Sequence, residues 1–125
     1  MGIVHHSSYL LYLEEARVEY LARRGAVYHE WVAQGLHFPV VDTRVRYRMA
    51  AKFYELLEIE TWVGEASRAM VRFDYLVRRG DQILAEGYTL LACIDDARRP
   101  RRIPQPILDQ MLGPERVASL DAARP

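Results

Sequence analysis

The chain is poor in cysteine and has no long apolar segment. Cys93 is the single cysteine among 125 residues, which excludes an intramolecular disulfide. Free thiols are typical of reducing compartments, so we expect a cytoplasmic protein in which Cys93 is a small buried strand residue. No apolar run approaches ~18 residues and no charged-then-apolar leader is evident, so the sequence predicts neither a membrane span nor a secretory signal.

Other absences exclude classes of function. The formal net charge is zero, which argues against binding to nucleic acid or to a membrane surface. No histidine or cysteine pair has metal-ligand spacing, so we expect no metal site. Glycine-rich phosphate motifs and a G-x-S-x-G motif are also missing, so we expect neither a nucleotide cofactor nor a serine nucleophile.

Hydrophobic periodicity predicts helices first and strands afterwards. Apolar residues at helical spacing indicate a helix over residues 8–24 that ends at Gly25, and a shorter helix over 27–34. From residue 40 the period changes to two, and Gly80-Asp81 is a hairpin turn signal. The predicted strands cover 40–48, 57–66, 69–78 and 82–95, a short helix covers 105–112, and the tail after about 113 is expected to be loosely ordered.

One long helix followed by four antiparallel strands is an α+β pattern, and we expect one domain over residues 1–125. Three arginines alternate along the first predicted strand, at Arg44, Arg46 and Arg48. We expect them to pair with Glu58 and Glu60 on a neighbouring strand, the alternative being plain exposure to solvent.

The first seventeen residues carry a resemblance to a known family. They read Met1-Gly2-Ile3-Val4-His5-His6-Ser7-Ser8-Tyr9-Leu10-Leu11-Tyr12-Leu13-Glu14-Glu15-Ala16-Arg17. This stretch resembles the D-x-D-x-x-G-[IV]-V-[FYH]-H-x-x-Y-[LF]-x-[YFW]-x-E-x-[AS]-R segment of hotdog-fold acyl-CoA thioesterases of the 4-hydroxybenzoyl-CoA thioesterase and YbgC type. Weaker similarity follows at Lys52–Ile59, at Ala92–Asp95 and at Ile103-Pro104, so the resemblance covers about residues 2–104.

The resemblance implies a hotdog fold, in which a curved antiparallel sheet wraps the long helix. In that family the first strand carries a catalytic Asp, which would lie before Met1 here. We therefore interpret the chain as truncated before that Asp, and expect four strands where relatives have five. Family members pair edge strands, which implies a homodimer or homotetramer, with the strand near 40–49 as the shared edge.

The implied activity is hydrolysis of acyl-CoA thioesters to a free acid and CoA, with coenzyme A as part of the substrate and no separate cofactor. A carboxylate would activate water, and backbone N–H groups at the start of the long helix would hold the oxyanion. His6 matches the family's histidine and could orient water, or could simply bond to backbone. Glu15 is our candidate for a substitute base, the alternatives being a structural ion pair with Arg17 or a contact across a subunit interface.

The resemblance also assigns binding residues. The oxyanion and acyl pocket would include Gly2, Val4, His5, Ser7 and Tyr9. The arginine cluster at Arg98, Arg99, Arg101 and Arg102 could hold the phosphates of CoA, or could be a solvated loop. Without the Asp the chain could be inactive, so two other functions stay open: a non-catalytic acyl-CoA-binding or scaffold protein and, with less support, a hotdog dehydratase.

Overall fold

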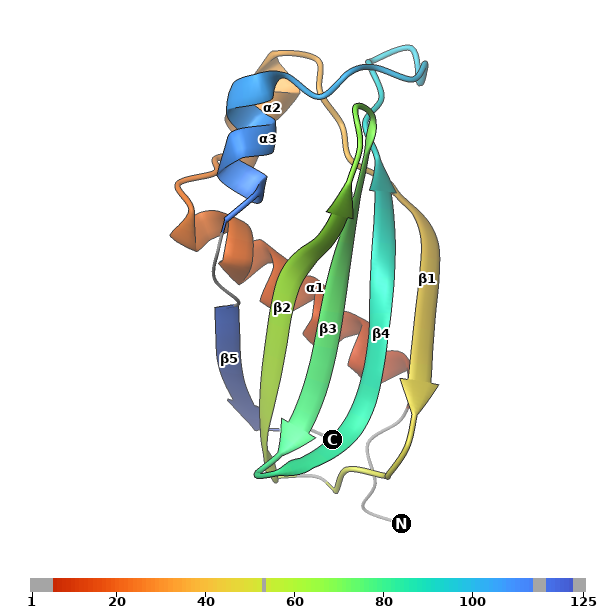
Figure 1. Ribbon diagram of the computed structural model, residues 1–125, viewed down its shortest axis with the longest axis vertical. Helices are drawn as coiled ribbons and strands as arrows, with labels where there is room; N and C mark the ends of the chain where they lie inside the picture. Colours follow the sequence, from red (N-terminus) through yellow and green to blue (C-terminus); the bar gives the residue numbers. More distant parts are fainter. Residues whose placement is uncertain (1–5, 53, 114–116, 123–125) are drawn as a thin grey trace.

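The computed structural model describes residues 6–52, 54–113 and 117–122. A long helix lies across one face of an antiparallel sheet, and two short helices sit together near one end of the strands (Figure 1). The elements in chain order are α1 His6–Arg23, α2 Tyr28–Ala33, β1 Val40–Tyr47, β2 Leu56–Ala66, β3 Met70–Arg79, β4 Gln82–Ala92, α3 Gln105–Met111 and β5 Val117–Ala122.

The predicted helices and strands are confirmed, with boundaries that shift by up to three residues. α1 ends as expected at Gly25, whose φ of 75° suits a residue without a Cβ atom. The Gly25 N–H donates to Ala22 and the Ala26 N–H to Leu21, so the last turn keeps partners for its carbonyl groups. The end of α1 is therefore fixed by local chemistry that the sequence displays.

Strand order corrects the expected arginine–glutamate pairing. The sheet runs β1-β4-β3-β2-β5, so β1 neighbours β4 and not β2. Arg48 consequently pairs with Glu86 of β4 at 2.8 Å, while Glu60 pairs with Arg78 of β3 at 2.7 Å. The expectation that β1 arginines meet Glu58 and Glu60 is wrong because the β3–β4 hairpin lies between the two strands.

A fifth strand corrects the expected four-stranded sheet. β5 pairs antiparallel with β2 from Leu56 opposite Ala122 to Thr61 opposite Val117. The tail after Gly113 was expected to be loosely ordered, whereas its residues 117–122 form this strand. A free β2 edge would leave backbone N–H and C=O groups unpaired, and β5 supplies partners for them.

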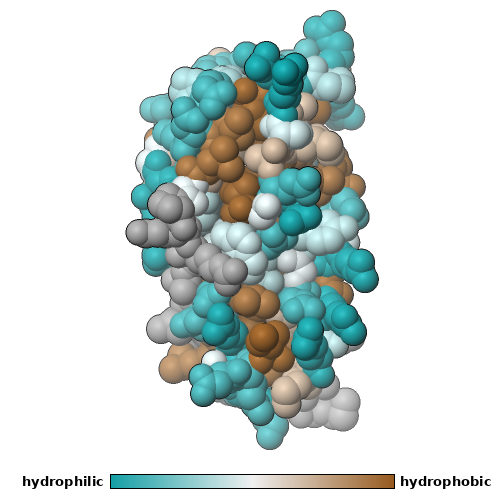
Figure 2. Space-filling view, viewed as in Figure 1, coloured by the Kyte–Doolittle hydropathy of each residue, from teal (hydrophilic) through white to brown (hydrophobic). Residues whose placement is uncertain are grey.

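The core lies between α1 and the inner face of the sheet. β3 alternates buried and half-buried side chains, with Val71, Phe73, Tyr75 and Val77 facing the helix. Polar side chains cover most of the outer face (Figure 2). Cys93 is buried directly after β4, and burial raises the pKa of its thiol.

Candidate functional site

The start of α1 lies beside the end of β1 (Figure 1). His6 and Ser7 form part of the first turn of α1. The first turn of a helix has backbone N–H groups without intrahelical partners and the positive end of the helix dipole. Gly2, Val4 and His5, as well as the side chains of His6 and Ser7, lie outside the described residues.

Tyr9 is buried one turn along the helix, with a relative exposure of 1%. Its ring packs edge-on against Tyr47 of β1, with centroids 5.2 Å apart. Its hydroxyl has no hydrogen-bond partner of good geometry among the described residues. Burial raises the pKa of Tyr9, and the nearby backbone amide of Ala51 opposes this only in part, so the hydroxyl is protonated at neutral pH.

The loop between β1 and β2 is held by a carboxylate. Glu55 accepts hydrogen bonds from Arg79 at 2.8 Å and from the Lys52 backbone N–H at 2.5 Å. The Arg79 hydrogen bond is the main cause that lowers the pKa of Glu55. The next residue back, Tyr54, is exposed and has a φ of 67°, a conformation that is uncommon for a residue other than glycine. This clamp fixes the loop that passes near Tyr9.

A cleft runs along α1 on the side that faces β1, and we name it the α1–β1 cleft. Its near chamber has a volume of about 220 Å³ and is lined by Leu10, Glu14, Arg17, Val40, Thr43 and Thr89. Its deep chamber has a volume of about 450 Å³ and continues past Leu21 to Trp31, Phe38, Phe73 and Met111. Both chambers are lined by Glu14, Arg17 and Val40, so they lie next to each other.

Arg17 bridges the cleft to the sheet. Its guanidinium donates to the Thr89 hydroxyl at 3.4 Å, and this hydroxyl also bonds to the buried Tyr75 hydroxyl at 2.7 Å. Glu15 is exposed and forms no ion pair with Arg17. Glu14 faces the cleft instead. Glu14 was not among the predicted site residues. Leu10 fills the [LF] position of the family motif, and the motif's glutamate follows four residues later, which is Glu14 and not Glu15.

The arginine loop is organised by Asp95. This carboxylate accepts the backbone N–H groups of Ala97 and Arg99, each at 2.9 Å, and the Arg99 amide is the main cause that lowers the pKa of Asp95. Arg99 also bonds to Asp95 through its side chain, and Arg101 donates to the Gln34 carbonyl at 2.8 Å. The remaining two cluster members, Arg98 and Arg102, are exposed and bond to no other side chain in the described ranges.

Within one chain the arginine loop and the start of α1 lie at opposite ends of the sheet (Figure 1). β1 alone has eight residues, which at ~3.3 Å each corresponds to about 25 Å. The structure therefore does not bring the four arginines to the helix start inside one protomer.

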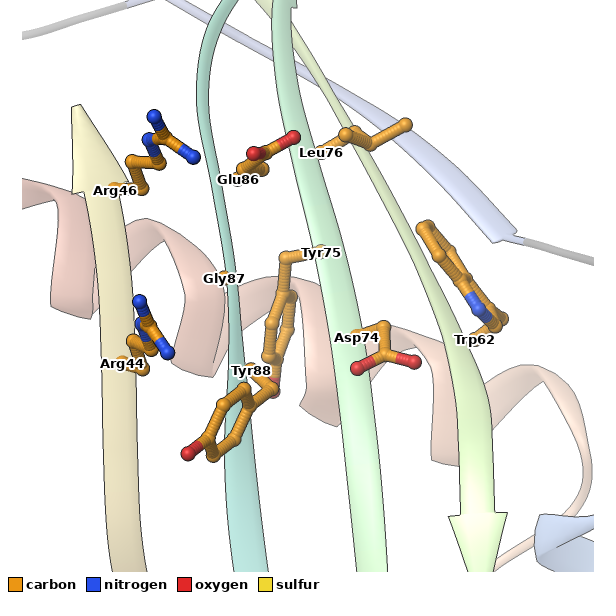
Figure 3. Close-up of a pocket in the computed structure, with 9 residues that line it drawn as sticks. All are labelled: Arg44, Arg46, Trp62, Asp74, Tyr75, Leu76, Glu86, Gly87 and Tyr88. Atoms are coloured by element: carbon orange, nitrogen blue, oxygen red, sulfur yellow. The ribbon is translucent and has the colours of Figure 1, made fainter. Parts of the chain in front are cut away.

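A second hollow of about 370 Å³ lies on the outer face of the sheet (Figure 3). Arg44 and Arg46 flank it on β1, and Trp62 lies across it on β2. Its carboxylates already have partners, since Asp74 pairs with Arg72 and Glu86 with Arg48. The sheet separates this hollow from α1.

Among the described residues no cluster of three or more metal-ligating side chains occurs. No helix in the same ranges is long and apolar enough to cross a membrane.

Comparisons with known proteins agree on one family. The thioesterase superfamily (4HBT) matches residues 1–86. The acyl-CoA thioesterase YbgC of Haemophilus influenzae is 34% identical over 95 residues, which cover 75% of this chain and 70% of that protein.

Solved structures show the same likeness. A hypothetical protein of Thermus thermophilus is 42% identical with a TM-score of 0.81, covering 89% of this chain and 85% of that one. The DHNA-CoA thioesterase of Staphylococcus aureus is 30% identical with a TM-score of 0.79, covering 87% of this chain and 74% of that one. The expected hotdog fold is thereby confirmed.

Proposed function

The chain belongs to the thioesterase superfamily, and from this membership we propose that it hydrolyses acyl-CoA thioesters to a free acid and CoA. The observation that carries the proposal is that the part of the family's opening motif from His6 onward forms the start of α1, next to the near chamber of the α1–β1 cleft. Unpaired backbone N–H groups at this turn suit the oxygen of a thioester that gains negative charge during attack.

In the proposed reaction, water adds to the thioester carbonyl carbon while a base takes its proton. The carbonyl oxygen becomes an oxyanion held by the first-turn N–H groups around His6 and Ser7. The C–S bond then breaks, CoA leaves as a thiolate that takes up a proton, and the carboxylic acid remains. His6 and Glu15 are our candidates for activating water, and we add Glu14 because it lines the cleft.

We also propose a homodimer formed through the β1 edge. Four apolar side chains at or just beyond this edge are exposed: Val40, Val41, Tyr47 and Met49. Two β1 strands paired about a two-fold axis run antiparallel. Such pairing would carry the partner's Arg98 and the partner's Arg102 toward this chain's helix start, where they could bind the phosphates of CoA. The mass of the assembly in solution distinguishes this dimer from a tetramer.

The experiment is release of free thiol from a panel of acyl-CoA and benzoyl-CoA thioesters, together with the mass of the assembly in solution. The variants His6→Ala, Glu14→Gln and Glu15→Gln test the three candidate groups, and loss of kcat without loss of binding would identify the base. Arg98→Ala in the dimer should raise KM for CoA thioesters and leave kcat unchanged. Binding of acyl-CoA without any turnover would contradict hydrolysis and favour the binding or scaffold function.

A further inference from the structure

We propose that the hollow on the outer face of the sheet, lined by Arg44, Arg46 and Trp62, binds a nucleoside monophosphate. In this assignment the phosphate lies on the β1 side, the ribose lies over the middle strands and the base lies against β2. The proposal is independent of the thioesterase activity, because the hollow lies on the face of the sheet that is turned away from α1 (Figure 3).

Two guanidinium groups on β1 supply the positive charge. Arg44 and Arg46 are exposed and lie on the outer face, since Val45 between them packs against the core. Neither arginine forms a hydrogen bond or an ion pair within the described ranges. Their Cα atoms are about 7 Å apart, as for any two alternate residues of a strand, so one phosphate can accept hydrogen bonds from both long side chains.

The carboxylates that line the hollow are already paired with other arginines. Glu86 forms an ion pair with Arg48 at 2.8 Å, and Asp74 forms one with Arg72 at 3.0 Å. Neither Arg48 nor Arg72 lines the hollow. These two ion pairs leave the positive charge of the β1 arginines available to an anion from solution.

The strand register orders the lining side chains as a nucleotide is ordered. Arg44 of β1 lies opposite Tyr88 of β4. Tyr88 lies opposite Asp74 of β3, and Asp74 lies opposite Trp62 of β2. The row therefore runs from a cation through polar groups to an aromatic ring (Figure 3). A nucleoside monophosphate has the matching order of phosphate, ribose and base.

Each part of the nucleotide meets a group of suitable chemistry. The carboxylates of Asp74 and Glu86 accept hydrogen bonds, as acidic side chains do from ribose hydroxyls in nucleotide sites. Leu76 of β3 gives the sugar an apolar floor between them. The half-buried indole of Trp62 offers a surface on which a base can stack. Because guanidinium groups hold the phosphate, the site needs no glycine-rich loop.

The width of the hollow disfavours smaller anions. β1 and β2 are separated by two strands, so three spacings of ~4.8 Å put their backbones about 14 Å apart. Benzoate or inorganic phosphate is shorter than this and would contact either the arginines or Trp62. The volume of about 370 Å³ lies within the range of small-molecule sites.

Calorimetric titration of the full chain with AMP tests the site. Arg44→Gln and Arg46→Gln should each weaken AMP binding at least tenfold, because each removes a charge-assisted hydrogen bond to the phosphate. Trp62→Leu should weaken AMP binding at least fivefold through loss of stacking, and should leave the weak binding of inorganic phosphate unchanged. Adenosine and inorganic phosphate should each bind the wild type at least tenfold more weakly than AMP.

Arg68→Gln is the matched control, because it removes the same charge from an exposed position. Arg68 lies between β2 and β3, does not line the hollow, and its side chain bonds to no described residue. It should change AMP binding less than twofold. Circular dichroism checks the fold of every variant, and exposed arginines are positions where substitution costs little stability.

Four outcomes decide the proposal. Absence of AMP binding by the wild type, or an equal loss in Arg68→Gln, would overturn the site. Equal affinities for AMP and inorganic phosphate would overturn it as well, since the base would then contribute nothing. CoA carries a nucleotide of its own, so CoA binding that Arg44→Gln weakens as much as AMP binding would assign the hollow to CoA and overturn a free mononucleotide. A protein that binds AMP as expected but cleaves no thioester would support this inference and refute the proposed function.

Discussion

Removal of the Tyr20 hydroxyl is a sharp test of how the deep chamber is built. Tyr20 is fully buried on α1, and its hydroxyl donates to the Met111 carbonyl at 2.5 Å. Met111 ends α3, and the last carbonyls of a helix have no intrahelical partners. The hydrogen bond therefore caps α3 and attaches it to α1. The Tyr20 ring also packs edge-on against Phe73, with centroids 5.5 Å apart, and Tyr20→Phe retains this contact.

Tyr20→Phe leaves a buried carbonyl without its partner, which costs about 1–3 kcal/mol of unfolding free energy. For a chain of this size 1 kcal/mol corresponds to about 4 °C in Tm, so we expect a fall of about 4–12 °C. Burial raises the pKa of Tyr20, so its hydroxyl is protonated in both folded and unfolded chains below its ordinary pKa of 10. The difference in Tm should therefore be constant between about pH 6 and pH 9.

Thermal unfolding followed by circular dichroism, at one protein concentration, measures the effect. Tyr28→Phe is the matched control, because Tyr28 is 60% exposed and its hydroxyl bonds to no described residue. We expect the control to change Tm by less than about 1 °C. A Tyr20→Phe protein with the same Tm as the Tyr28→Phe control would refute the view that this hydrogen bond attaches α3 to α1.

Three further predictions concern the loop clamp, the β1–β4 contact and the cleft. Arg79 lowers the pKa of Glu55 in the folded protein below its ordinary value of 4.5. The ionised carboxylate therefore stabilises the fold at pH values above 4.5, and this stabilisation is lost as the pH falls through the lowered pKa. The Tm of Glu55→Gln should thus fall less between pH 5 and pH 3 than that of the wild type, and parallel curves would contradict the clamp. Gly87→Ala should cost about 2 kcal/mol in thermal unfolding, because its Cβ would lie 2.1 Å from the Arg44 carbonyl oxygen and push β1 away; an unchanged Tm would contradict this contact. Thr89→Val removes a buried hydroxyl with two hydrogen-bond partners and should lower the urea midpoint by an amount equivalent to about 1–3 kcal/mol, whereas an unchanged midpoint would show that these bonds contribute little.

Local features of the fold could be predicted from the sequence, and long-range pairing could not. Gly25 and the helical spacing before it define α1, because both depend on neighbours within a few residues. The pairing of β1 with β4 depends on which strand edges meet in space. The alternation of side chains along a strand is the same whichever strand lies beside it, so the sequence pattern does not identify the neighbour. β5 was missed for a similar reason, since six residues give a weak period-two signal and only β2 makes them a strand.

The candidate site shows the same limit within a single helix. The family motif points to the first turns of α1, but a shift of one residue rotates a side chain by about 100°. Glu14 shares the cleft side with Leu10, Arg17 and Leu21, whereas Glu15 points away from it. Of the four arginines in the arginine loop, Arg99 already bonds to Asp95 within the loop and Arg101 to the Gln34 carbonyl next to α2, so their role as phosphate ligands stays a prediction.

The last strand has a consequence for how the protein is made. β5 pairs with β2, although the two strands are separated by some fifty residues of chain. During synthesis at the ribosome, β2 emerges long before its partner, so its outer edge stays available to any other strand in the meantime. A neighbouring nascent chain could donate its own last strand there, and exchange of β5 between molecules is the misassembly to which this topology is most open.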